Sequence, residues 1–223
     1  MLKKRIIPKF LLRNGRLVKY VQFFEQEREA GNPVSTARVY NDYGADEFII
    51  LDIAPSEDSR QGVLDSIAKM SEQIFMPFTV GGGVRTLEHI NDLLRAGADK
   101  ISVNTQAVRD PGFVKTAAQP VDWALRMQDM NCGEILITSI DRDGTLSGYD
   151  VDMIARLNEA LDIPLVVSGG CGGLQHCIEA FNAGASAGGI SSLFLFTDHS
   201  PIKLRSHLVS NGINVRASTS SRN

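Results

Sequence analysis

Short runs of Val, Ile and Leu alternate along this chain with stretches in which apolar residues recur every three or four positions. The run at 48–51 is typical of a buried strand, and the stretch at 65–74 is typical of an amphipathic helix. Apolar strands separated by helices indicate a parallel sheet that is covered by those helices. The pattern opens with a predicted strand over 5–12 and closes with a predicted helix over about 200–212.

The pattern also repeats within the chain. A shift of 87 positions lays residues 47–105 over residues 134–192 without a gap, and 16 of the 59 aligned pairs are identical. Each copy reads strand, helix, strand, helix, strand. We therefore predict a single α/β domain over residues 1–223, a (β/α)8 TIM barrel of two duplicated half-barrels. A doubly wound sheet is the alternative, but its dinucleotide-binding glycine pattern is absent.

One strand of that barrel has no place in the sequence. Only 28 residues separate Thr105 from Glu134, and they must supply two helices and the fifth strand. The segments 110–119 and 120–130 are predicted as those helices, with Pro120 at a helix start. Either the barrel is internally shortened and lacks strand 5, or a segment between Gln119 and Pro120 is missing from the sequence as written.

Composition narrows the class of function. A net charge of −3 and a hydrophobic fraction of 43% argue against a nucleic-acid binder, and no apolar run is long enough to span a membrane. Three cysteines without metal-ligand spacing predict neither a disulfide framework nor a metal site, and fit a reducing compartment. We expect a cytoplasmic protein without a cofactor, whose partners are small molecules or proteins.

Small residues follow four of the predicted strands. In a parallel barrel the active site lies where the strands end, and glycine, serine, threonine and asparagine there present donors to an anion. Because the arrangement occurs in both copies, we predict two phosphate sites and a small substrate with a phosphate at each end. The predicted binding residues are Gly82, Gly83, Asn104, Thr105, Asp143, Gly144, Gly169, Gly170, Ser191 and Ser192.

Three charged residues are candidates for chemistry at the same end of the barrel. Asp143 follows the strand that begins at Glu134 and is able to act as a general base, to hold a hydroxyl or simply to cap its loop. Asp52 ends the strand of the first copy and is a second carboxylate able to point inward. Lys19 follows an Asn-Gly turn and either brings a flexible cation over the site or is a solvated surface lysine.

The opposite end of the barrel carries a balanced set of charges. Each of these charges stands at the start of an apolar strand, so all of them would converge at the bottom of a closed barrel. Buried charges are costly unless they are paired. We therefore predict a ring of salt bridges, which in its simplest role plugs the barrel, formed by Arg5, Glu47, Lys100 and Glu134.

These motifs resemble those of the cyclase subunit of imidazole glycerol phosphate synthase over nearly the whole chain. The matching stretches are RII, NGRLVK, DEFIILDI, PFTVGGG, GADKISVNT, GEILITSIDRDGT, SGYD, SGG and GINVR. The resemblance implies a duplicated barrel that pairs, as a heterodimer, with a glutaminase subunit of the class I amidotransferase type. It further implies that this ring of charges is a gate through which ammonia enters and reaches a bisphosphate substrate, and that Asp99 contacts the glutaminase.

The chain departs from that family at the two positions that carry the family's catalytic aspartates. The family uses two aspartates as acid and base, at the ends of strands 1 and 5. Leu11 stands at the strand 1 position and cannot transfer a proton, and the strand 5 position is missing. The segment from Pro8 to Leu12 is more similar to paralogues of surface-polysaccharide pathways, in which ammonia is used to form an acetamidino group on a nucleotide-activated sugar.

Three functions remain open on these residues. The first is a paralogue that channels ammonia for acetamidino modification of a nucleotide sugar. The second is the histidine-biosynthesis cyclase itself, with unusual residues, which would form imidazole glycerol phosphate. The third is a catalytically dead remnant that binds at most phosphate or a partner.

Overall fold

A computed structural model describes residues 3–21, 25–103 and 120–217 of the chain. The described residues form two compact units. We call residues 7–19 and 26–103 the first unit, and residues 3–6, 20–21, 25 and 120–217 the second unit. Each copy of the sequence repeat, as far as it is described, falls within one unit.

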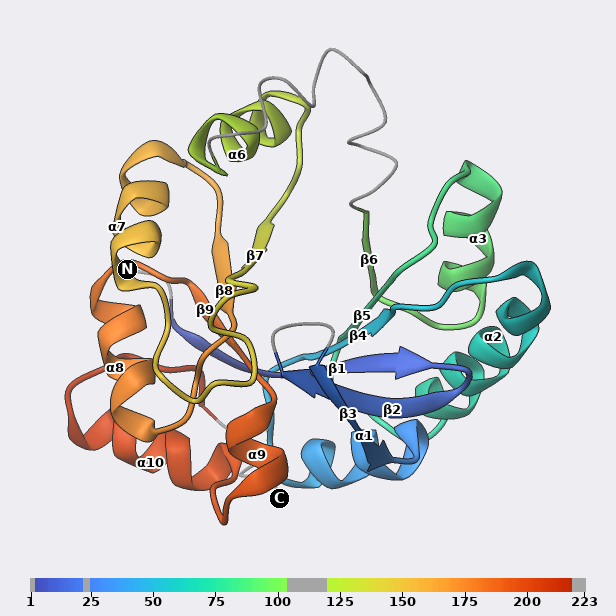
Figure 1. Ribbon diagram of the computed structural model, residues 1–223, viewed down its shortest axis with the longest axis horizontal. Helices are drawn as coiled ribbons and strands as arrows, with labels where there is room; N and C mark the ends of the chain where they lie inside the picture. The colour runs from blue at the N-terminus through green and yellow to red at the C-terminus, as the bar shows by residue number, and fades with distance from the viewer. Residues whose placement is uncertain (1–2, 22–24, 104–119, 218–223) are drawn as a thin grey trace. The chain divides into compact units, whose positions relative to one another are not determined.

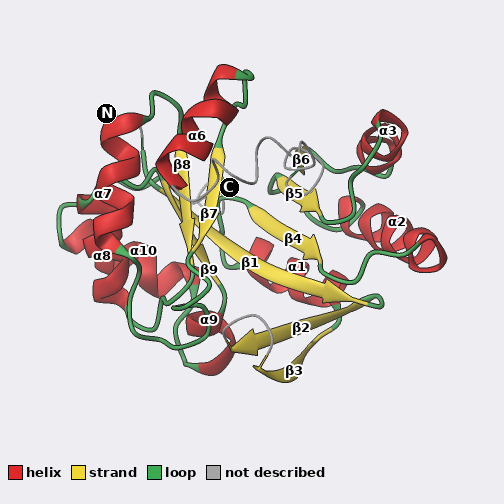
Figure 2. Cartoon of the chain, turned by 45° about the horizontal axis from the view of Figure 1, so that its top comes forward, coloured by secondary structure: helices red, strands yellow, loops and turns green. Residues whose placement is uncertain are grey.

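The first unit is a parallel sheet with helices along its outer side (Figures 1 and 2). Neighbouring strands are paired in the order β1, β4, β5 and β6, and all of these pairs are parallel. The first two residues of β1 belong to the second unit. The elements are β1 (Arg5–Arg13), α1 (Pro33–Asp42), β4 (Phe48–Asp52), α2 (Glu57–Ser71), β5 (Phe78–Gly81), α3 (Leu87–Arg95) and β6 (Lys100–Ser102).

Its helices begin where the sequence supplies capping side chains. The Asn32 side chain accepts hydrogen bonds from two backbone N–H groups of α1, and the Thr86 hydroxyl accepts one at the start of α3. Between α1 and the sheet, the ring of Phe10 lies 5.4 Å from that of Tyr40 and 5.3 Å from that of Phe48. This aromatic cluster fixes the first helix on the sheet.

The second unit repeats the arrangement with three parallel strands (Figure 1). Helices α7 and α8 pack against each other, and α10 packs on α8. The start of the chain also belongs here, because the Arg5 N–H donates to the Ser186 carbonyl. The elements are α6 (Pro120–Asp129), β7 (Ile135–Thr138), α7 (Val151–Ala160), β8 (Leu165–Ser168), α8 (Leu174–Asn182), β9 (Ala187–Ile190), α9 (Ser192–Phe196) and α10 (Pro201–Ser210).

The described elements confirm the predicted α/β class, in which parallel strands alternate with helices as in each half of a (β/α)8 barrel. The helix predicted at 120–130 is α6. The helix predicted at 110–119 lies outside the described residues. Between β6 and β7, the described part of the chain contains α6 and no strand.

A hairpin after β1 was not predicted. β2 (Arg16–Val21) runs antiparallel to β1, and β3 (Glu25–Gly31) pairs with β2. The turn between β1 and β2 is Asn14-Gly15, and both residues have positive φ angles, of 50° and 76°. An Asn-Gly pair between apolar runs is the strongest short hairpin signal in a sequence, so the hairpin follows from local sequence.

Candidate functional site

The predicted residues of the second phosphate site lie at the carboxyl ends of three neighbouring strands. β7, β8 and β9 are paired in parallel, so the segments that follow them share one edge of the second unit. Two of these segments are joined directly, because the Gly148 N–H donates to the Gly170 carbonyl at 2.8 Å. The residues brought to this edge are Asp143, Gly144, Gly169, Gly170, Ser191 and Ser192.

This edge of the second unit is tightly packed. Gly169 has a φ of +95°, and a Cβ there would overlap the Ser139 carbonyl oxygen. Asp143 is 7% exposed and Ser192 is 6% exposed. Backbone that is held this closely presents its N–H groups in fixed positions, which suits recognition of a phosphate.

The predicted first phosphate site is described only in part. Gly82 and Gly83 follow β5, and Gly82 has a φ of +96° with its Cα against the backbone of Asp52. Asn104 and Thr105 lie outside the described residues. The described part of this predicted site consists of the loop after β5 and the end of β4.

A small cavity of about 80 Å³ adjoins this loop in the first unit. Its lining includes Asp52 and three basic side chains that were not predicted, Arg60, Arg85 and His89. Arg60 donates to Asp92 at 3.0 Å, and the His89 Nδ1–H donates to the Gly83 carbonyl at 3.2 Å. The identity of His89 with the aligned His176 was the one signal in the sequence that pointed to this histidine.

Asp52 and Lys19 are both buried in the first unit. Asp52 is 9% exposed, and its Oδ1 accepts a hydrogen bond from the Ala54 N–H at 3.0 Å. Burial raises the pKa of Asp52 above its ordinary value, and the bond from Ala54 opposes this shift only in part. Lys19 lies in β2 and is 4% exposed, so it is neither a solvated surface lysine nor part of a flexible loop.

The residues of the predicted gate form two ion pairs, one in each unit. In the first unit the Lys100 Nζ donates to Glu47 Oε2 at 2.8 Å, and in the second unit Arg5 pairs with Glu134. The buried member is the carboxylate of Glu47 in one pair and the guanidinium of Arg5 in the other. The pairing supports the predicted charge balance, and a single ring of four remains a prediction.

Asp99 lies at the amino end of the strands, beside Lys100. Its carboxylate accepts a hydrogen bond from the Phe78 N–H at 2.9 Å, and its own N–H donates to the Phe78 carbonyl. The residue is exposed. Its predicted contact with a glutaminase therefore requires no rearrangement of buried groups.

Leu11 lies in β1 opposite Leu51 of β4 and is 6% exposed. The end of β1 therefore holds an apolar side chain where proton transfer would need an ionisable one. The nearest carboxylate along the paired strand is Asp52, which is in register with Leu12.

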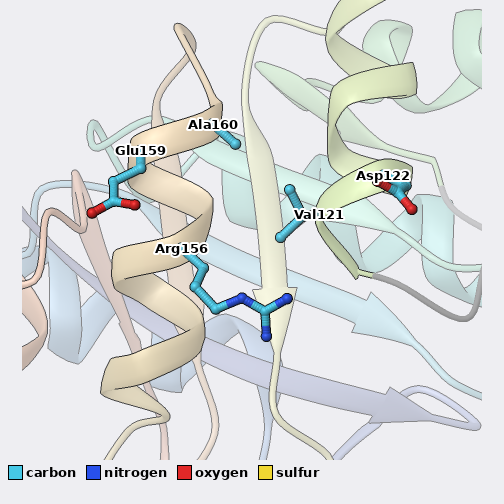
Figure 3. Close-up of a pocket in the computed structure, with 5 residues that line it drawn as sticks. All are labelled: Val121, Asp122, Arg156, Glu159 and Ala160. Carbon is cyan, nitrogen blue, oxygen red and sulfur yellow. The ribbon is translucent and has the colours of Figure 1, made fainter.

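A larger cavity, of about 410 Å³, lies between α6 and α7 of the second unit (Figure 3). Its lining is Val121, Asp122, Arg156, Glu159 and Ala160. In Figure 3 the Arg156 side chain extends toward α6, whereas the Glu159 carboxylate points away. All five residues lie within α6 and α7, whereas the predicted phosphate residues follow β7, β8 and β9, so the cavity is separate in the unit from the predicted phosphate site.

The described residues contain neither a metal-binding cluster nor a membrane-spanning helix. No group of three or more His, Cys, Asp or Glu side chains there is placed to hold a metal ion. No helix of residues 3–21, 25–103 and 120–217 is long and apolar enough to cross a membrane.

Comparison with known proteins gives a family match in two parts. The chain matches the family described as histidine biosynthesis protein over residues 5–121 and again over residues 115–200. It is also 40% identical to the imidazole glycerol phosphate synthase subunit HisF of Alkaliphilus metalliredigens (strain QYMF), over 97% of this chain and all of that protein. The alignment has 252 positions, more than the 223 residues of the chain, so part of the relative has no counterpart here.

Proposed function

The chain belongs to the histidine biosynthesis protein family, and on that premise we propose that it uses ammonia from a glutaminase on a small phosphorylated substrate. Its subfamily is that of the imidazole glycerol phosphate synthase cyclase subunit. We propose further that it is a paralogue that forms an acetamidino group on a nucleotide-activated sugar, in a step in which the nitrogen of ammonia replaces the acetamido oxygen and that oxygen leaves as water.

The observation that carries the finer proposal is Leu11. An aspartate at this position would be the acid or base of the usual cyclisation, and a leucine packed beside β4 cannot take that role. The second aspartate of the family belongs to strand 5, and the two family matches meet at residues 115–121, where that strand is expected. The usual chemistry thus lacks its acid and base, whereas the residues for phosphate are retained.

The partner proposal rests on the amino ends of the strands. The Alkaliphilus relative is a synthase subunit, and therefore a protein that works with another. The Lys100–Glu47 and Arg5–Glu134 pairs supply charges where ammonia would enter, and Asp99 supplies an exposed carboxylate next to Lys100 in the chain. A class I glutaminase that docks here as a heterodimer is the partner that these features fit.

The histidine-pathway cyclase itself is the second candidate. It is favoured by the 40% identity over the full length of a cyclase subunit. In that case Asp52 or Asp143, with Lys19, would have to carry the acid and base steps, and both aspartates are buried at strand ends. A catalytically dead remnant is the third candidate and would show neither activity.

An assay with free ammonia separates the three. The purified chain, checked by intact mass and circular dichroism, is incubated with ¹⁵N-ammonium and either the aminoimidazole ribonucleotide precursor or an acetamido nucleotide sugar. We expect ¹⁵N in the sugar product and none in the imidazole product. The Alkaliphilus subunit, run in parallel, is the positive control for the imidazole assay.

Each other outcome identifies a competing function. Turnover of the imidazole precursor by the chain would replace the proposal with the histidine cyclase. A folded chain of the expected mass that labels neither product would favour the remnant. A mass several kilodaltons above 24.3 kDa would instead show that a segment is missing from the sequence as written.

A further inference from the structure

Two thiols and a phenol lie together behind the second phosphate loop. We call residues 169–173, which connect β8 to α8, the β8–α8 loop. Cys171 belongs to this loop and Cys177 to α8, and their sulfur atoms are 3.5 Å apart. The Tyr149 phenol lies beside both thiols, and its hydroxyl donates to the Gly189 carbonyl at 3.5 Å. All three side chains are buried, so they form one enclosed cluster.

We propose that Cys171 and Cys177 are an oxidation site, at which a disulfide forms reversibly and displaces the β8–α8 loop. The oxidant is a peroxide small enough to reach buried sulfur. This inference concerns regulation of the second phosphate site and, for its functional consequence, rests on the proposed function.

The two thiols are differentiated for the reaction. The hydrogen bond from Cys177 lowers the pKa of Cys171, although burial opposes the shift, and the same bond raises the pKa of Cys177. Cys171 is thus the sulfur that reacts first, because the thiolate is the nucleophile. It attacks hydrogen peroxide to give a sulfenic acid and one water. The Cys177 sulfur then displaces the hydroxyl of that acid as a second water, and both thiol hydrogens are consumed.

Bond formation requires movement of the loop. A disulfide places its sulfur atoms about 2.05 Å apart, so the present separation must shorten by more than an ångström. Cys177 is held within α8, whereas Cys171 lies in a loop with glycines on both sides. The closing motion therefore falls mainly on Cys171 and on Gly170, to which it is bonded.

Movement of Gly170 reaches the predicted phosphate residues. Its carbonyl accepts the hydrogen bond from Gly148, and a Cβ on Gly170 would overlap the Gly148 carbonyl oxygen. Gly172 is packed equally closely on Leu146. The segment from Ser139 to Asp150, which includes Asp143 and Gly144, thus shifts with the β8–α8 loop. We expect a loss of about tenfold in affinity for phosphate, the equivalent of one hydrogen bond to a charged group.

The test uses the whole chain and measures three quantities separately: the oxidation of the thiols, the hydrogen exchange of the loop and the affinity for phosphate. After mild treatment with hydrogen peroxide, peptide mapping without reductant should show a Cys171–Cys177 link and the loss of two hydrogen atoms, reversed by dithiothreitol. Hydrogen exchange should rise at the amides of Gly148 and Gly170. A titration with inorganic phosphate, followed by ³¹P NMR, should show that the affinity for phosphate falls by about tenfold.

Matched variants assign each effect. Cys132→Ser removes the third thiol, which contacts the Glu134 carbonyl and lies apart from the cluster, and should leave every response unchanged. Cys171→Ser and Cys177→Ser should each abolish the link and the exchange response. Two independent variants are used so that poor folding of one does not decide the result.

Three outcomes would overturn the inference. One is that Cys171 and Cys177 remain reduced while Cys132 oxidises. Another is a link that forms without a change in hydrogen exchange at Gly148 or Gly170. The third is a loop response that persists in both cysteine variants. If reduced protein binds no phosphate, the proposed function fails, and the mapping and exchange results still decide this inference.

Discussion

The two copies of the repeat share a close backbone contact at their strand ends and differ in side-chain chemistry. In each copy a glycine after the second strand lies against the aligned residue of the first strand, Gly82 on Asp52 and Gly169 on Ser139. Their φ angles are +96° and +95°. The β8–α8 loop of the second copy carries a thiol, whereas the first copy has Val84 at the aligned position. The copies therefore share a scaffold on which each has its own chemistry.

The aligned histidines show the same contrast. The His89 Nδ1 carries a proton, because its partner is the Gly83 carbonyl. The His176 Nδ1 carries none, because it accepts from the Gly172 N–H at 3.2 Å. Identical residues at identical positions are thus held as opposite tautomers by the loops that they contact.

Aligned strands of the two copies differ in exposure at the point where the copies adjoin each other in the sequence. β9 is buried at every residue, whereas the aligned β6 is exposed or half-buried. β4 is buried at four of five residues, whereas the aligned β7 is half-buried throughout. The exposed strands are the two that flank the expected strand 5. The repeat therefore accounts for the burial of β4 and β9. The shortened segment accounts for the greater exposure of β6 and β7.

The largest expected effect tests the shared scaffold. Gly82→Ala and Gly169→Ala each place a Cβ on a backbone carbonyl at a positive φ, so each should lower the free energy of unfolding by about 2–3 kcal/mol in urea titrations. The loss should be at least as large for Gly82, where the added Cβ would lie 1.9 Å from the Asp52 carbonyl oxygen, as for Gly169, where it would lie 2.4 Å from that of Ser139.

Gly62→Ala is the control for this pair. Gly62 lies within α2 with no atom near its missing Cβ, so the change should stabilise the chain by about 0.5–1 kcal/mol. Wild-type stability in Gly82→Ala would show that the first loop does not share the scaffold of the second.

A smaller effect tests the opposite tautomers. His89→Phe and His176→Phe each remove one hydrogen bond and should each cost about 1 kcal/mol. Long-range ¹H–¹⁵N spectra of the wild-type chain should show a protonated Nδ1 for His89 and a bare Nδ1 for His176, with His207 of α10 as the reference. The same tautomer at both positions would contradict the comparison.

The smallest effect concerns a carboxylate present in only one copy. Because burial raises the pKa of Asp52 above its ordinary value of 3.8, the folded state holds this proton more tightly than the unfolded state. The chain therefore loses stability as pH rises from 3.8 through the folded pKa. Asp52→Asn stays neutral and retains an acceptor for the Ala54 N–H.

The measurement compares urea midpoints of the two proteins from about pH 3.5 to about pH 7. The variant should be the more stable at neutral pH, and its advantage should disappear at the acid end. The matched change Ser139→Asn, in the copy that lacks the carboxylate, should show no such pH dependence. A variant less stable than the wild type at neutral pH would show that ionised Asp52 is stabilised in the folded chain.

The sequence by itself determined the repeat, the order of strands and helices within each copy and the positions of the loop glycines. These follow from short-range periodicity and from the few residues that tolerate a positive φ, both of which are local properties. The same local reading located the shortage of residues between β6 and β7, and it contained the Asn14-Gly15 hairpin signal.

Only the tertiary structure decided which groups meet. Strand register decides that Lys100 pairs with Glu47 and that Arg5 pairs with Glu134. The way in which each loop packs on the next decides that Cys171 lies against Cys177, beside Tyr149. The burial of Lys19 likewise depends on the hairpin that carries it. Spacing along a chain does not encode such contacts, because they join residues through packing rather than through sequence neighbourhood.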